Sequence, residues 1–210
     1  MGDRSTGAPG EDFGWKSLVE LDPKDVSRKS LATYDMKSSK YVLKILNTTY
    51  DIVLGDKSIK VAEGKEGLLP KFSVDFNIMI LDYLVNSREI PLSSKLVAGA
   101  QLKTGEFFFR GTHGLELDSL IEKFGSDPNG FKEAGILLEG KVMDLGDVSL
   151  QLQVLPRVPT TYVLWVADEE FSARISVLFD STAESHMHLD TLRTAVITAN
   201  KSLLFAKQHP

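Results

Sequence analysis

Apolar and polar residues alternate clearly in the last third of the chain. Residues 148–154 place Val or Leu at every second position, with Ser or Gln between them, which is the period of a strand with one buried face. Residues 173–179 alternate in the same way, whereas residues 161–166 are apolar at almost every position. This pattern predicts a three-stranded antiparallel meander whose middle strand is covered on both sides.

A second group of strands is expected nearer the N-terminus. Residues 41–46, 50–54 and 58–61 are rich in β-branched and aromatic side chains, and a Gly-containing turn at 55–57 joins the last two. These features predict a hairpin or meander. A further strand pair is expected around a turn at 103–105, with the following run of three Phe residues covered on both faces.

Helical periodicity occurs between and after these strands. It is clearest over residues 72–86, which contain no internal Gly or Pro. Asp22 and Pro23 are a typical helix start and predict a helix that reaches about residue 36. Two short helices are expected at 115–124 and 131–138, and a final helix is expected from Thr191, with Asp190 as its cap.

Antiparallel groups of strands with helices between them predict an α+β fold. The chain has 210 residues, of which 42% are hydrophobic, enough for one sizeable core. We therefore expect a single domain over residues 15–210, which could divide into lobes at about 15–140 and 141–210. Residues 1–14 are rich in Gly, Pro and acidic residues and are expected to be a disordered tail rather than a signal peptide.

The composition excludes several classes of protein. A net charge of -5 argues against binding to nucleic acid or to anionic membranes. No stretch approaches the ~18 apolar residues of a membrane-spanning helix, so a cytoplasmic location is expected by default. The absence of cysteine excludes disulfides, thiolate nucleophiles and iron–sulfur clusters held by this chain.

Four short motifs carry a resemblance to a known family. They are LPRVP at 155–159, Leu164-Trp165, DEEF at 168–171 and LFD at 178–180. They resemble an uncharacterised bacterial family known only as a domain of unknown function, whose members occur mainly in anaerobes. Some relatives carry an extra cysteine-rich iron–sulfur segment, which this chain lacks, and the resemblance implies an association with corrinoid or methyl-transfer metabolism.

The same motifs contain the first candidate site. Asp168, Glu169 and Glu170 follow the middle strand, where their carboxylates could bind a cation or a basic partner, or cap the backbone of an exposed turn. Arg157 lies between two prolines that restrict its backbone, so its guanidinium could grip an anionic ligand or an internal carboxylate. We expect Arg157 to pair with Glu169 or Glu170. Trp165, on the middle strand, is expected in the core.

Two weaker candidates lie elsewhere. Arg110 and His113 follow the Phe run and could stand at the mouth of an apolar pocket, or belong to a loop anchored by that run. His186, His188 and Asp180 are the residue types of a two-histidine, one-carboxylate metal site, although surface histidines are the simpler interpretation. No catalytic residue is assigned, because hydrolase, kinase and dehydrogenase motifs are absent from the sequence.

We therefore expect a non-catalytic accessory protein that binds a small molecule, with a tetrapyrrole of the corrinoid type among the candidates, or a protein partner. One alternative is an enzyme that uses the carboxylates at 168–170, with or without a metal. Another is a pure interaction module that accepts a partner strand at a sheet edge. The sequence identifies no cofactor.

Overall fold

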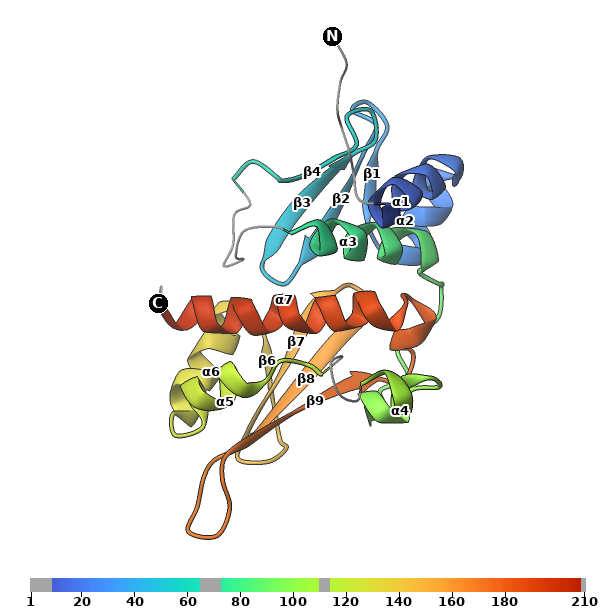
Figure 1. The fold of residues 1–210 in the computed structure, drawn as a ribbon. Coiled ribbons are helices and arrows are strands. Elements are labelled where there is room, and N and C mark those ends of the chain that lie inside the picture. Colours follow the sequence, from blue (N-terminus) through green and yellow to red (C-terminus); the bar gives the residue numbers. More distant parts are fainter. Residues whose placement is uncertain (1–8, 65–72, 110–113, 209–210) are drawn as a thin grey trace.

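Figure 1 shows the computed structural model, which describes residues 9–64, 73–109 and 114–208. The elements in chain order are α1 (Pro9–Glu20), α2 (Pro23–Ser30), β1 (Thr33–Asp35), β2 (Lys40–Ile45), β3 (Thr48–Val53), β4 (Ser58–Val61), α3 (Val74–Asn86), β5 (Leu96–Ala98), α4 (Gly105–Phe108), α5 (Asp118–Phe124), α6 (Pro128–Leu137), β6 (Lys141–Met143), β7 (Val148–Leu155), β8 (Val158–Trp165), β9 (Arg174–Asp180) and α7 (Leu189–Gln208). Both sheets are antiparallel, with strand orders β1-β2-β3-β4 and β5-β9-β8-β7-β6. The fold is therefore α+β, as the sequence predicts.

The first sheet and helices α1 to α3 form one half of the molecule (Figure 1). Its strands β2 and β3 bury every second side chain, among them Tyr41 and Tyr50. Helix α3 is capped by Ser73, whose hydroxyl accepts a hydrogen bond from the amide of Phe76. The Phe76 ring then lies 5.3 Å from the ring of Tyr50. Hydrophobic burial thus fixes one face of α3 against the sheet and leaves its other face for α1 and α7.

The second sheet has β8 at its centre. All but the last of the β8 residues are buried, which confirms the two-sided burial predicted for the middle strand. Helix α7 crosses this sheet, and the buried Tyr162 donates a hydrogen bond to Asn200 of α7 over 2.8 Å. This bond satisfies a hydroxyl that would be costly to bury without a partner.

The two sheets meet through α3 and α7, which lie side by side (Figure 1). The amide of Leu46, just after β2, also donates to the carbonyls of Gln153 and Val154 in β7 over 3.2 and 3.3 Å. The chain passes from the first sheet to the second between α3 and β5. The lobe boundary that the sequence placed near residue 140 is therefore wrong, because β5 pairs with β9 and α6 packs on α7.

Two predictions near the N-terminus are corrected. Residues 9–14 do not belong to a disordered tail, because α1 begins at Pro9 and buries Trp15 and Leu18. The helix that begins at Pro23 is capped by Asp22 as expected, but it ends at Ser30 rather than near residue 36. Leu31 has a left-handed φ of 61°, which stops the helix and allows the next residues to form β1.

Two predictions in the second sheet are also corrected. The expected strand pair around 103–105 is absent, since Gly105–Phe108 forms the short helix α4. Trp165 is only partly buried, because it stands at the end of β8, where the guanidinium of Arg174 lies 4.3 Å from its ring centre. Within the described parts of the chain, no helix is both long and apolar enough to cross a bilayer.

Candidate functional site

A groove of about 560 Å³ lies between α1, α3 and the start of α7. Its walls include the apolar side chains of Phe13, Ile78 and Val85, and its lining also carries the polar groups of Asp82 and His188. Pockets for small molecules typically have this size and combine apolar walls with a few polar groups. We therefore take this groove as the candidate functional site.

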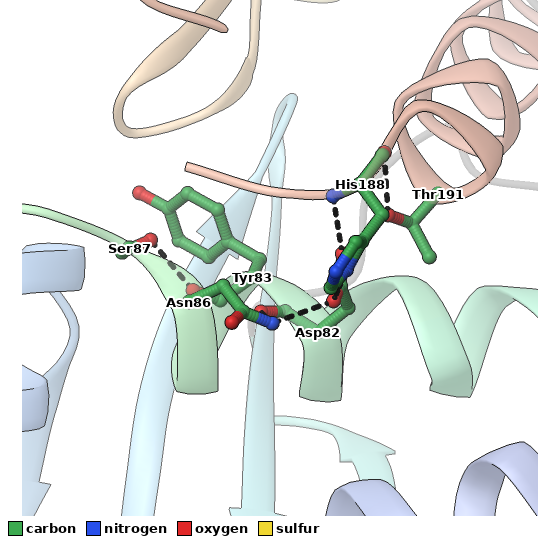
Figure 2. Close-up of polar contacts among 6 residues, drawn as sticks. All are labelled: Asp82, Tyr83, Asn86, Ser87, His188 and Thr191. Atoms are coloured by element: carbon green, nitrogen blue, oxygen red, sulfur yellow. Dashed lines mark hydrogen bonds and ion pairs between the residues drawn. The ribbon is translucent and has the colours of Figure 1, made fainter. Parts of the chain in front are cut away.

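Asp82 connects the polar residues that line the groove. Its carboxylate accepts hydrogen bonds from the His188 amide over 2.9 Å, from the Asn86 side-chain amide over 2.7 Å and from the Thr191 hydroxyl. The ring nitrogen Nδ1 of His188 lies 2.6 Å from Oδ1 of Asp82 (Figure 2). The Asp82 side chain is only 10% exposed. With four partners, the carboxylate is saturated and serves to position other groups.

In contrast to Asp82, the His188 side chain is 72% exposed. When the imidazole is neutral and Nδ1 donates its proton to Asp82, the other nitrogen, Nε2, carries a free electron pair. Among the residues that the structure describes, none forms a hydrogen bond with Nε2. The ring is thus held at one edge and available at the other.

The local sequence explains how His188 is held. Helix α7 begins at Leu189, and the Leu192 amide donates to the His188 carbonyl, so His188 occupies the N-cap position. A His side chain does not cap well, and here Asp82 from α3 supplies the carboxylate instead. The contact that begins α7 is therefore the same contact that orients the imidazole.

The neighbouring residue of α3 faces the other way and ties the two halves of the molecule together. The Tyr83 hydroxyl donates to the Ser30 carbonyl over 2.8 Å and accepts from the Arg157 amide over 3.1 Å. Figure 2 shows the Tyr83 ring directed away from His188, with the Ser87 hydroxyl on the Tyr83 carbonyl. Burial raises the pKa of Tyr83, so this hydroxyl stays protonated.

Arg157 does not pair with the acidic turn, which corrects the expectation from the sequence. Its guanidinium donates to the carbonyls of Arg28 and Lys29, in the last turn of α2, and to that of Ile90 over 2.8 Å. Carbonyls at a helix C-terminus lack partners within the helix and favour a cation. The prolines at 156 and 159 restrict the backbone around Arg157, and its side chain links α2 and the segment after α3 to the start of β8.

The acidic turn lies at the opposite end of β8 from Arg157. The eight residues of β8 rise ~3.3 Å each, so the two ends of the strand are roughly 26 Å apart. Asp168 caps its own turn, because its carboxylate accepts from the amides of Phe171 and Glu170 over 2.7 and 2.9 Å. These bonds lower the pKa of Asp168. Glu169 and Glu170 are exposed. A smaller hollow of about 380 Å³ lies beside the turn.

The histidines and Asp180 do not come together as a metal site. His186 is fully buried rather than on the surface, and its Nδ1 accepts from the Arg88 amide over 3.4 Å. Asp180 is buried as well and accepts from the amides of Ser93, Ser94 and Thr182. In the described ranges no three His, Asp or Glu side chains could hold a metal ion together.

The pKa shifts of the buried His186 and Asp180 fit structural roles. Burial is the main cause that lowers the pKa of His186 to about 4, and the charge of Arg157 adds to it. Burial acts to raise the pKa of Asp180, but hydrogen bonds from Thr182 and Ser93 outweigh it and leave that pKa lowered. His186 is therefore neutral and Asp180 charged at neutral pH. Arg110 and His113 lie outside the described residues.

Sequence reasoning missed Asp82 and Phe13. Asp82 lies within a helix whose apolar period is clear, and a single carboxylate there is typical of a solvated face. Phe13 lies in a segment expected to be disordered. The sequence predicted that the last helix begins at Thr191 with Asp190 as its cap, whereas α7 begins at Leu189, so the need of His188 for a capping group from α3 was hidden.

Comparison with known proteins adds one finding. The family described as "Domain of unknown function (DUF3786)" matches residues 22–199, which include Asp82, His188 and Arg157 but not α1. No curated protein and no solved structure matches the chain.

Proposed function

The chain belongs to this family, whose description names no activity, and we propose that it is a non-catalytic accessory domain that binds a small molecule in the groove between α1, α3 and α7. In this proposal His188 touches the ligand, and Asp82 acts as a positioning residue.

The orientation of His188 carries the proposal. Its Nδ1 lies 2.6 Å from the Asp82 carboxylate, while the side chain is 72% exposed and lines a largely apolar groove. A carboxylate on one imidazole nitrogen is the usual arrangement behind a histidine that binds a metal with the other.

The charges of the groove bear on the class of ligand. Its described lining contains the carboxylates of Asp82 and Asp190 and no Lys or Arg. These charges disfavour a haem, whose side groups are anionic, and suit a corrinoid with amide side chains and a cationic metal. A bound corrinoid would supply a cobalt ion that accepts an imidazole nitrogen. The protein's part is to orient His188 Nε2 and to cover the macrocycle with Phe13 and Val85.

The test is a titration of the purified protein with aquocobinamide, followed by visible absorption. We expect one equivalent to bind, with the spectral shift of imidazole coordination. His188→Ala should abolish that shift, and Asp82→Asn should lower affinity by roughly 10- to 100-fold because the imidazole loses its orienting partner. Asp168→Asn, which changes an equivalent charge in the acidic turn, is the matched control. Unchanged binding to His188→Ala would refute the proposal.

A protein partner has its support at the acidic turn rather than at the groove. Phe171 is 68% exposed and follows the exposed Glu169 and Glu170, in a hairpin that projects from the body of the molecule (Figure 1). An exposed aromatic ring next to acidic groups suits a basic protein surface. A photo-cross-linker at position 171 should capture a partner in host extract, whereas one at the exposed Val19 should not.

A further inference from the structure

We propose that α1 supplies the wall of the groove that selects the ligand, and that Phe13 stacks on a flat, neutral or cationic ring system. This inference rests on the proposed function, because it concerns the same groove.

Helix α1 lies outside the part of the chain that is shared with the family. The family match begins at residue 22, whereas α1 ends at Glu20. Asp82 and His188 fall within the matched part, but Phe13 and Gly14 do not, although all four line the groove. One side of the site therefore belongs to the family domain and the other is supplied by the segment before it.

The position of α1 on α3 is set by close contacts. A Cβ at Gly14 would lie 2.8 Å from the Cβ of Leu81, so only glycine permits this approach. The Asn77 side chain donates to Glu11 over 3.0 Å. Trp15 and Leu18 are buried and account for the packing of the helix. The wall is thus held against α3 without any contribution from Phe13.

Phe13 is free to serve another purpose. It is 71% exposed, although it lines the same groove as His188. A single exposed apolar side chain is common on proteins. This one, however, stands on a helix that is fixed against α3, and it lines the groove that His188 also lines, where an aromatic ring can cover the face of a planar ligand.

The chemistry of the lining limits what Phe13 can stack on. The described lining residues contribute the carboxylates of Asp82 and Asp190 and no cationic side chain. Anionic ring systems are therefore disfavoured, whereas neutral rings gain from apolar contact and cationic rings gain in addition from the aromatic face. The inferred ligand class is a flat neutral or cationic ring system.

Two probes separate this inference from the proposed function. Aquocobinamide tests the metal-binding imidazole and the wall together, and Nile red, a flat neutral dye, tests the wall alone. Phe13→Ala should weaken the binding of both by roughly three- to tenfold, and Phe13→Tyr, which keeps the ring, should restore it. His188→Ala should weaken aquocobinamide only.

Val19→Ala is the matched control, because Val19 lies on the same helix, is 56% exposed and does not line the groove. The thermal midpoint of Phe13→Ala should equal that of wild type, which excludes a folding defect. If Phe13→Ala binds both probes normally while His188→Ala loses aquocobinamide, the inference about α1 is wrong and the proposed function stands. If wild type binds neither probe, both are wrong.

Discussion

The groove and the acidic turn use carboxylates in opposite ways. At the groove, Asp82 accepts hydrogen bonds from three residues of two helices and holds His188 outward. At the turn, Asp168 accepts from the amides two and three residues away, and these bonds close its own loop. One carboxylate joins distant segments, and the other closes a local one.

This difference shows why a conspicuous sequence motif need not be a site. DEEF is dense in charge because it forms a short exposed turn, whose backbone needs an acceptor and whose surroundings are water. Asp82 of α3 is inconspicuous in the sequence, yet burial and four hydrogen bonds commit it to one geometry.

Removal of the Asp82 carboxylate should have the largest effect. Asp82→Ala leaves the His188 amide and the Thr191 hydroxyl without their acceptor and takes away the cap of α7, so we expect a loss of about 2–4 kcal/mol in the free energy of unfolding. Urea denaturation measures it. Asp168→Ala, at the exposed turn, should lose much less. Equal losses for the two variants would remove the distinction between the two regions.

Arg157 should come next. Arg157→Ala removes the donors from three backbone carbonyls at the junction of the two halves, and we expect a loss of about 1–3 kcal/mol. Arg157→Lys should recover only part of it, since a lysine cannot reproduce the guanidinium fork. Glu169→Ala and Glu170→Ala should leave the urea midpoint unchanged. A clear loss in either would restore the pairing expected from the sequence.

Acid should then weaken the fold through His186. Its pKa is lowered to about 4 by burial, against an ordinary value of 6.5, so below pH 6.5 the unfolded chain takes up a proton that the native state refuses. Stability should fall as the pH drops from about 6.5 to about 4. The lowered pKa values of Asp168 and Asp180 act below their ordinary value of 3.8 and thus outside this window. Urea midpoints across this range should be flatter for His186→Asn.

Substitutions at the tip of the acidic turn should affect stability least. Phe171 is 68% exposed, so Phe171→Ser should change the free energy of unfolding by no more than about 0.5 kcal/mol. It should also leave aquocobinamide binding at the groove unchanged. A loss of that binding would mean that the two regions are coupled. Absorption titration and thermal denaturation on the same sample check both outcomes.

Several elements followed directly from local pattern. The periodicity over 72–86 predicted α3, and the alternation over 148–154 and 173–179 predicted β7 and β9. The prediction failed where local preference was overruled: Leu31 adopts a left-handed conformation that ends α2, and the Phe run begins in α4 instead of forming a strand. In both places the backbone takes a conformation that residue type alone does not dictate.

The α+β class, the buried central strand and the family could be predicted from local pattern, because burial period and short motifs are properties of neighbouring residues. The partners of the polar side chains could not, because they come from distant parts of the chain. Asp82 and His188 are 106 residues apart, and Arg157 reaches Lys29 across 128. Such contacts depend on how α2, α3 and α7 pack. The apolar pattern of each helix is compatible with many packing arrangements, so the groove is defined only by the arrangement that the folded core adopts.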